Sequence, residues 1–294
     1  PQMRGSFRSR PMDDIVAEAR MLADLGKREL ILVSQEATLY GADRGKVQIL
    51  PLLDELQKID GIEWIRLMYL HPQMVDVSLI SYLSEPNKTL PYYDLPLQHI
   101  NNDMLKRMRR QVRRPKIEEI LAEIRERRPD AVIRTTFIVG FPGETEEQFS
   151  ELYQFAEEFR FDRMGAFAYS NEEGSSAAIM PDQIPEEVKT ERVEAIEDLQ
   201  NDIASENNQR LIGAQLNVLV DSAATDEDPA LGRTAGDCPD VDQIVYIREQ
   251  VESDSGSGDS EYHPDSALQV GQFCRVKVLD TVGLDLITER VSAK

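Results

Sequence analysis

Apolar and polar positions along the chain follow two periodicities in turn. Short apolar runs with alternating burial predict strands, and longer stretches with apolar residues every three or four positions predict amphipathic helices. The clearest strand, Ile133 to Val139, leads through Gly140 and Gly143 into a helix. This helix begins with the capping-box sequence Thr-Glu-Glu-Gln at residues 145–148. Strands alternating with helices in this way form parallel sheets covered by helices.

The alternation continues from residue 11 to about residue 210. Strands are predicted at residues 29–33, 64–70, 92–97, 133–139 and 163–168. Helices are predicted at residues 11–25, 47–58, 75–83, 102–108 and 115–127, from residue 145, and at 185–210. Because the series begins with a helix, we expect one further strand upstream of Pro1.

After Gly213 the pattern changes to short β-rich runs separated by turn-rich stretches, among them Ser253–Ser260. The runs lie at residues 216–220, 244–247, 273–279 and 285–289. Short strands with turns between them predict a small all-β barrel. We therefore expect two domains, residues 1–210 with a long closing helix and residues 211–294.

Composition favours some functions and disfavours others. The chain has 33 Lys and Arg against 54 Asp and Glu, a net charge of −21. This charge disfavours non-specific binding to nucleic acids and favours cationic partners, although it can also serve solubility alone. No apolar run approaches the roughly twenty residues of a membrane span, so we expect no membrane association. Two cysteines, Cys238 and Cys274, are too few for a disulfide framework, which favours the cytoplasm.

Polar residues or glycine follow each of the five predicted strands. The strand ends read Ser34-Gln35-Glu36, Tyr69-Leu70-His71-Pro72, Leu97-Gln98-His99, Gly140-Phe141-Pro142-Gly143-Glu144 and Tyr169-Ser170-Asn171. Single loops are often polar for no functional reason, but five of them at the carboxyl ends of parallel strands indicate a pocket for a polar ligand. His71 and His99 could be ligands or general bases, although isolated histidines are more often structural. Nothing in the pattern supplies a nucleophile or a metal site.

Four motifs occur in order along the first domain. They are Arg4–Pro11, Leu30–Glu36 followed by Tyr40-Gly41, Asp94–His99, and Phe137–Thr145. With these motifs the chain resembles the radical S-adenosylmethionine methylthiotransferases over essentially its whole length. The resemblance implies an α/β fold, namely a partial parallel (β/α) barrel of radical-SAM type followed by a small all-β TRAM barrel of OB-like form. Members cleave the cofactor reductively to a 5′-deoxyadenosyl radical, which removes a substrate hydrogen before sulfur insertion.

In that family a C-x3-C-x2-C segment holds a [4Fe-4S] cluster just before the first of these motifs. The resemblance therefore implies three cysteines immediately upstream of Pro1, an N-terminal domain with a second cluster before them, and an electron donor that reduces the cluster. The chain itself has no thiolates spaced for an iron–sulfur cluster. We expect it to be inactive on its own.

The resemblance also assigns seven cofactor-binding residues: Ser34, Gln35, Glu36, Gln98, Ile138, Gly140 and Phe141. The first three would meet the methionine part of S-adenosylmethionine, the fourth the ribose, and the last three the adenine. A carboxylate at Glu36 can pair with an ammonium group, and glycine at position 140 lets a ring stack flat against the backbone. No catalytic or metal-ligating residue is assigned to this chain.

Two branches of the family differ in substrate, which is either an aspartate of a small-subunit ribosomal protein or an adenosine of transfer RNA. Residues Gly232–Asp242 are similar to the G-R-T-x-x-D-x-P-x-x-D pattern of the ribosomal-protein branch, and Arg8–Arg10, Leu97–His99 and Tyr169–Gly174 also match it better. Residues 211–294 carry 6 basic and 16 acidic residues, a net charge of −10. An acidic TRAM domain suits a basic ribosomal protein better than RNA.

Two observations keep alternatives open. Residues 106–116 contain seven cations in eleven positions, which could contact RNA or could cancel acidic neighbours on a solvated helix face. We favour the second interpretation and, with it, the ribosomal-protein branch over transfer RNA. Because the cluster cysteines are absent, the chain could instead be a non-catalytic module that binds a ribosomal protein or RNA.

Overall fold

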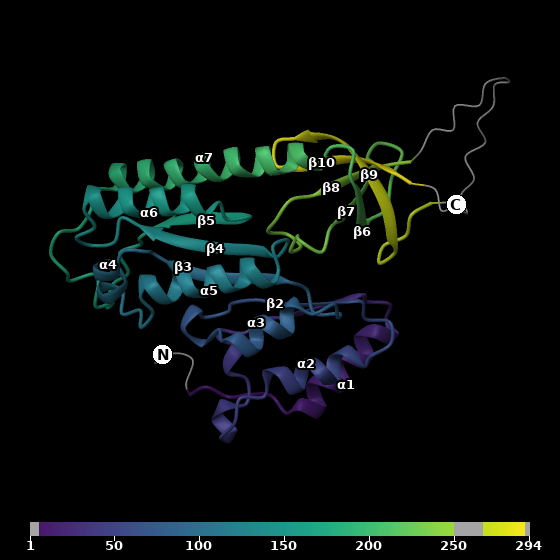
Figure 1. Ribbon diagram of the computed structural model, residues 1–294, viewed down its shortest axis with the longest axis horizontal. Helices are drawn as coiled ribbons and strands as arrows, with labels where there is room; N and C mark the ends of the chain where they lie inside the picture. The colour runs from purple at the N-terminus through teal and green to yellow at the C-terminus, as the bar shows by residue number, and fades with distance from the viewer. Residues whose placement is uncertain (1–5, 250–266, 292–294) are drawn as a thin grey trace. The chain divides into compact units, whose positions relative to one another are not determined.

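The computed structural model describes residues 6–249 and 267–291. The chain divides into two compact units, Pro1–Gln200 and Asn201–Lys294 (Figure 1). Arg4 and Gly5 of the first motif and the turn-rich stretch at 253–260 lie outside the described residues.

Five parallel strands form the sheet structure of the first unit. They are β1 (Glu29–Leu32), β2 (Trp64–Leu67), β3 (Tyr92–Gln98), β4 (Val132–Val139) and β5 (Arg163–Ala168). Strand β1 pairs with β2, while β3, β4 and β5 form a second sheet in that order. A parallel bridge between Ile65 and Thr89 and a 2.8 Å hydrogen bond from Leu70 N to Asp94 O connect the two sheets. The predicted α/β fold with a partial parallel barrel is confirmed.

Helices connect and flank these strands, as the crossover rule for parallel sheets requires. They are α1 (Met12–Asp24), α2 (Ile49–Gln57), α3 (Val77–Ser84), α4 (Asn102–Arg107), α5 (Arg114–Arg127), α6 (Glu146–Phe159) and α7 (Glu186–Leu211). Each predicted helix is present, with ends within about two residues of the prediction. Three short 3₁₀ segments, η1 (Ala37–Leu39), η2 (Ala42–Arg44) and η3 (Pro72–Met74), are additional.

Strand β4 and helix α6 form where local sequence signals are strongest. Burial alternates along β4, so that Ile133 and Phe137 are fully buried while Arg134 and Ile138 on the other face are only half-buried. The capping box of α6 is complete, because Thr145 N donates to Gln148 Oε1 at 3.0 Å and Gln148 N donates to Thr145 Oγ1 at 3.3 Å. The strand-to-helix connection that carries the fourth motif is therefore fixed at both ends.

The second unit contains a closed five-stranded barrel. Its strands are β6 (Gln215–Ser222), β7 (Ala230–Arg233), β8 (Val245–Arg248), β9 (Phe273–Val282) and β10 (Asp285–Arg290), in the order β10-β8-β7-β6-β9. Valine, isoleucine and leucine side chains such as Val218, Ile247 and Val276 fill its core. The small all-β barrel is confirmed, and the four predicted runs form β6, β8, β9 and β10, whereas β7 was not predicted. Strand β7 is only four residues long and contains a glycine, so it has no clear alternating pattern.

Residues of the 232–242 motif stabilise a loop of this barrel. Thr234 N donates to a carboxylate oxygen of Asp237 at 3.2 Å, and Cys238 N donates to Asp242 Oδ2 at 2.8 Å. Arg233 lies 3.0 Å from Asp221 on the neighbouring strand. The motif that distinguishes the two branches in sequence therefore has internal structural roles here. Among the described residues, no helix has the length and apolar character that a membrane crossing requires.

Candidate functional site

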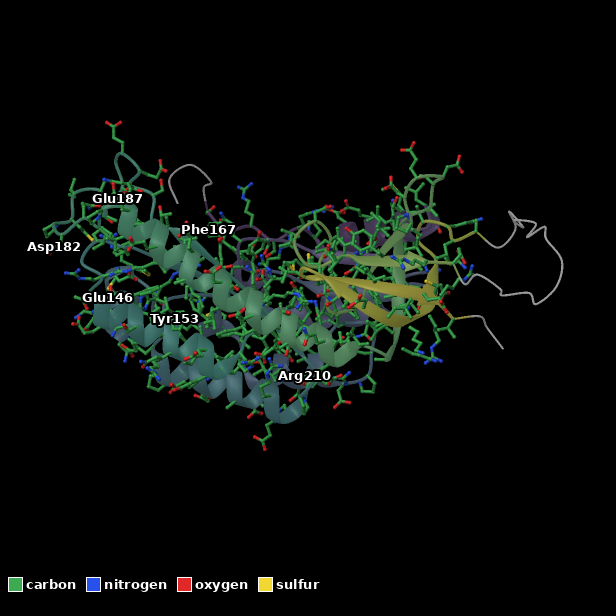
Figure 2. The ribbon with its side chains drawn as sticks, turned by 90° about the horizontal axis from the view of Figure 1, so that it is seen from above. Glu146, Tyr153, Phe167, Asp182, Glu187 and Arg210 are labelled. Carbon is green, nitrogen blue, oxygen red and sulfur yellow. The ribbon has the colours of Figure 1, made fainter. Side chains whose placement is uncertain are left out.

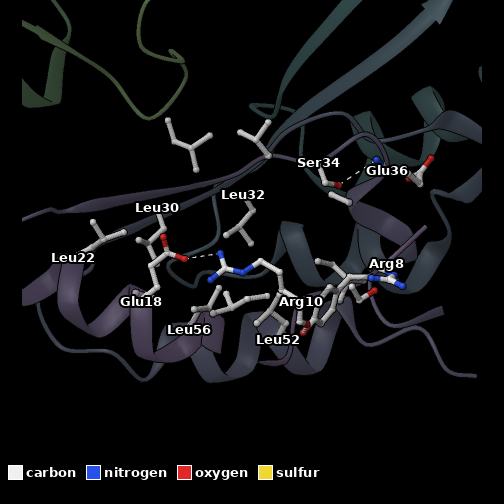
Figure 3. A pocket seen from close by; sticks show the side chains of 18 of the residues that line it. Arg8, Arg10, Glu18, Leu22, Leu30, Leu32, Ser34, Glu36, Leu52 and Leu56 are labelled. Carbon is white, nitrogen blue, oxygen red and sulfur yellow. Dashed lines mark hydrogen bonds and ion pairs between the residues drawn. The ribbon is translucent and has the colours of Figure 1, made fainter. Parts of the chain in front are cut away.

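A pocket of about 530 Å³ lies beside β1, at the level of the strand ends and the first helix (Figure 3). Ser34 and Glu36 line it, together with residues 8–10 of the first motif. In the close view, Arg10 reaches across to Glu18 and forms a 2.6 Å ion pair with it. Two of the seven sequence-assigned residues thus line one cavity. Gln35 is exposed and does not line it.

The first and second motifs are held together by hydrogen bonds between residues thirty or more positions apart in sequence. The hydroxyl of Ser9 accepts from Gly41 N at 2.8 Å and donates to Asp43 Oδ1 at 2.5 Å, while the hydroxyl of Tyr40 donates to Arg10 O at 2.8 Å. Through these hydrogen bonds, the first and second motifs each fix the backbone of the other.

The loop after β1 shapes the position of Glu36. Its backbone N–H donates to Ser34 Oγ at 3.1 Å, and its carboxylate accepts from the hydroxyl of Thr38. Both bonds are local, so they turn the chain sharply after the strand. The Glu36 carboxylate stays partly accessible and can accept a further donor from a ligand.

Glu36 and Arg110 lie within electrostatic range of His71, although the three residues come from separate loops. Burial lowers the pKa of His71; the Glu36 carboxylate opposes this shift and the Arg110 guanidinium reinforces it. Burial also lowers the pKa of Arg110 from its ordinary value. The loops after β1, β2 and α4 therefore bring together an acid, an imidazole and a cation.

Arg110 is a site residue that sequence reasoning missed, because it lies within the basic run 106–116. Four other cations of the run have partners. Arg114 pairs with Glu118 and Glu151, Lys116 with Glu119, while Arg107 and Arg113 donate to backbone carbonyls. Within the described residues the side chains of Lys106, Arg109 and Arg110 have no such partner, and of these three only Arg110 is half-buried, while the other two are exposed. A half-buried cation without a carboxylate partner is a structural signal that cannot be read from a sequence.

The other part of the site lies at the ends of β3, β4 and β5. Gln98 ends β3 with a φ of +71°, and Gly140 follows β4 with a φ of +69°. Phe141 is buried and meets Tyr169 edge-on, with 5.0 Å between the ring centroids. Ile138 lies on the half-buried face of β4, where it pairs in register with Phe167 of β5. Four of the sequence-assigned residues thus lie at neighbouring strand ends.

A fully buried carboxylate, Glu144, holds these ends together. One oxygen lies 3.0 Å from His99 Nε2, and the other accepts from Gly140 N at 2.6 Å and from Arg192 Nη1 at 2.5 Å. The Nδ1 atom of His99 accepts from the backbone N–H groups of Ile100 and Asn101, both at 2.9 Å. The imidazole must therefore carry its proton on Nε2 and donate it to Glu144. Both ring nitrogens are engaged, which makes His99 structural.

The Cβ side of Gly140, where a ring was expected to stack flat against the backbone, is filled, and so is the Cβ side of Gly143. A Cβ at Gly140 would collide with the side chain of Lys189, and a Cβ at Gly143 would collide with the guanidinium of Arg107. Both positions also have positive φ values, which side chains with a Cβ rarely adopt. The glycines are thus required by the turn and by close packing, and a ring could not stack on the Cβ side of Gly140.

The described residues fit the two cofactors of the resembled family differently. The half-accessible carboxylate of Glu36 and the unpartnered guanidinium of Arg110 suit the ammonium and carboxylate groups of an amino acid. No group of three or more histidine, cysteine and acidic residues in the described ranges could hold a metal ion. The two cysteines of the chain, both buried, lie in the second unit. The chain therefore does not fit an iron–sulfur cluster.

Comparison with known families identifies two segments. Residues 1–156 match the model of the Radical SAM superfamily, and residues 212–291 match the model of the TRAM domain. Among solved structures, coproporphyrinogen III oxidase from Escherichia coli aligns with a TM-score of 0.49 at 18% identity, over 67% of this chain and 45% of that one.

Curated relatives match almost the whole chain. The ribosomal protein uS12 methylthiotransferase RimO of Desulfitobacterium hafniense is 40% identical over 292 residues, which are 99% of this chain and 62% of that protein. The proteins of the same name from Clostridioides difficile and Geobacter sulfurreducens are 41% and 42% identical and are covered to 61% and 62%. The chain spans about three fifths of the length of these relatives.

Proposed function

The chain belongs to the Radical SAM superfamily, and we propose that it serves in a methylthiotransferase that adds a methylthio group to an aspartate of a basic small-subunit ribosomal protein. The observation that carries this proposal is the match of nearly the whole chain to relatives named ribosomal protein uS12 methylthiotransferase. The arrangement of charges at the strand ends supports it independently, because it provides complementary groups for an amino-acid cofactor.

The charged end of the site would hold the methionine part of S-adenosylmethionine. Glu36 pairs with the ammonium group, and Arg110 pairs with the carboxylate, which removes the cost of burying its charge alone. Ser34 and Gln35 belong to the same loop and complete this end. Bound there, S-adenosylmethionine supplies the radical chemistry of the superfamily, while the protein supplies position and exclusion of water.

The other end would hold the nucleoside. Gln98 faces the ribose, and Ile138, Gly140 and Phe141 form the adenine side. The ring of Tyr169, edge-on to Phe141, limits the movement of this wall. Because Lys189 occupies the Cβ side of Gly140, the adenine would lie against the side of β4 on which Ile138 is half-buried. The [4Fe-4S] cluster of the superfamily would be held by residues other than those of this chain.

The ribosomal protein would be attracted by charge. Residues 211–294, which include the TRAM domain, have a net charge of −10, and the whole chain has −21. Such a field steers a basic protein toward the surface and weakens binding to RNA phosphates. Since most of the cations at 106–116 already have internal partners, the charge available for RNA is small.

Two titrations of this chain test the proposal. Calorimetry with S-adenosylhomocysteine should detect binding, and titration with purified uS12 should give a complex that weakens as salt is raised. Transfer RNA titrated in the same buffer should bind at least about tenfold more weakly than uS12. Tighter binding of transfer RNA would favour the other branch, and binding of neither S-adenosylhomocysteine nor uS12 would contradict the proposal.

A second candidate, contact with RNA, is favoured by one observation. Lys106 and Arg109 are exposed, and their side chains have no partner within the described residues. If these two cations bind RNA, replacing both with methionine should lower the salt dependence of RNA affinity by about two phosphate contacts. A non-catalytic module would bind uS12 but not S-adenosylhomocysteine, so the two titrations above distinguish it.

A further inference from the structure

We propose that helix α7 controls cofactor affinity through a clamp formed by Glu144, Lys189 and Arg192. The clamp holds the ends of β3, β4 and β5 in the geometry that binds the adenine. This inference rests on the proposed function, because it concerns the same cofactor site. It extends that function to α7, which lies outside residues 1–156 that match the superfamily model.

Glu144 is the centre of the clamp. Its side chain is 0% exposed, and its two oxygens together contact His99, the backbone N–H of Gly140 and the guanidinium of Arg192. These three partners come from the end of β3, the turn after β4 and the second turn of α7. A single carboxylate therefore fixes the distance between two strand ends and a helix that lies more than forty residues away in sequence.

Lys189 forms the second arm of the clamp. It is 2% exposed, its aliphatic stem fills the space beside Gly140, and its Nζ donates to Tyr169 O at 3.1 Å and to Glu186 Oε1 at 2.6 Å. The ammonium also lies 5.5 Å from the centre of the Tyr169 ring. Lys189 thus connects the turn after β4 to the end of β5, where the aromatic wall of the site begins.

The first half of α7 is placed to hold both arms. It runs beside α6, and Figure 2 marks Glu187 near the start of α7 and Glu146 at the start of α6. Arg192 Nη2 lies 3.1 Å from Glu146 Oε2, so the same guanidinium that holds Glu144 also ties the two helices together. Any shift of α7 along α6 would move the partner of Glu144.

Packing alone does not require these charges. A buried ion pair contributes little net stability, and apolar residues of similar size often replace it without loss, whereas removal of one partner leaves an unpaired buried charge. The other inward residues of α7, among them Ile196 and Leu199, already provide apolar contacts. The charged clamp therefore fixes the positions of the strand ends relative to α7, because hydrogen bonds constrain direction and distance more closely than apolar contacts do. We regard Glu144, Lys189 and Arg192 as positioning residues.

The test uses the double variant Glu144→Gln with Arg192→Met, which removes both charges together and leaves no unpaired buried ion. Calorimetry of the whole chain with S-adenosylhomocysteine should show affinity about tenfold weaker than the unaltered chain, and Lys189→Met should act in the same direction. Glu191→Gln, on the exposed face of α7, is the matched control and should leave affinity unchanged. Arg192→Lys should restore part of the affinity that Arg192→Met loses.

Amide hydrogen exchange provides a readout that does not depend on the ligand. The Gly140 amide should exchange faster in the double variant, while amides in the barrel core of the second unit should be unchanged. The inference would be overturned if the Gly140 amide of the double variant exchanged as slowly as that of the unaltered chain, or if the two proteins bound S-adenosylhomocysteine with equal affinity. If the unaltered chain binds no S-adenosylhomocysteine, the proposed function fails and the affinity part of the inference fails with it. If the unaltered chain binds S-adenosylhomocysteine and the double variant binds it equally well, the role of the clamp is refuted and the proposed function is not.

Discussion

The two ends of the candidate site differ in whether their charged side chains have hydrogen-bond partners within the protein. Beside His71, which also lies within electrostatic range of Glu36, the guanidinium of Arg110 is half-buried, and within the described residues its side chain has no hydrogen-bond or ion-pair partner. Around Glu144, both carboxylate oxygens are occupied by His99, Gly140 and Arg192. Charges with unused hydrogen-bonding capacity are available to a ligand, whereas a saturated network can only fix the protein around it. The difference separates binding residues from positioning residues.

The largest expected effect is at the saturated end. Glu144→Ala leaves the buried Arg192 with only the exposed carboxylate of Glu146 and the Gly140 amide without an acceptor, so the free energy of unfolding should fall by about 3–5 kcal/mol. Urea denaturation of the whole chain measures this change. Glu147→Ala, which removes an exposed carboxylate from the same helix start, should lower the free energy of unfolding far less. Equal stabilities for the two variants would show that the hydrogen bonds of Glu144 do not stabilise the protein more than an exposed carboxylate does.

Arg110→Met should weaken cofactor binding without lowering the stability of the protein. Affinity for S-adenosylhomocysteine should fall about tenfold to a hundredfold, because the guanidinium is expected to bind its carboxylate. The free energy of unfolding should stay the same or rise, since the variant removes a half-buried cation that has no carboxylate partner. Arg109→Met, next to it but exposed, serves as the control for both measurements. A large loss of stability in Arg110→Met would show that Arg110 holds the fold together, as Glu144 and Arg192 do, and would contradict its role in binding the cofactor.

Glu36→Gln should have a smaller effect, about three- to tenfold on the same affinity, because this carboxylate is partly exposed to solvent. Higher salt should reduce the difference between the variant and the unaltered chain, as expected for a solvent-screened charge pair. Glu55→Gln, a half-buried position of α2 that does not line the pocket, provides a charge-matched control. An effect of the control as large as that of Glu36→Gln would mean that only net charge matters.

His71 should make the smallest contribution, visible through pH. Its pKa in the folded chain lies below the ordinary 6.5, so the unfolded chain binds more protons as pH falls below that value. The free energy of unfolding should therefore decline between pH 6.5 and the folded pKa and should level off below it. Urea denaturation of His71→Gln at pH 7.5 and pH 5.5 should show less of this decline. The same pH dependence in both proteins would contradict the assignment.

Local patterns in the sequence predicted most of the fold. The alternation along Ile133–Val139 and the capping box at Thr145 are properties of neighbouring residues, so the strand and the helix can be predicted from them. Strand ends follow from the same patterns, which is why the polar loops of the candidate site were found. Strand β7 was not predicted, because four residues with an internal glycine give no periodic signal.

Tertiary structure alone decided which of these residues meet. Glu144 contacts His99 and Arg192 across 45 and 48 residues of sequence, and Lys189 occupies the space that Gly140 seemed to leave open. Whether Arg110 faces solvent or the strand ends depends in the same way on how the loop after α4 packs. The sequence therefore determined the kinds of elements and the edge of the sheet that carries the site. Folding determined which charges are satisfied internally, because that depends on distances between segments far apart in the chain.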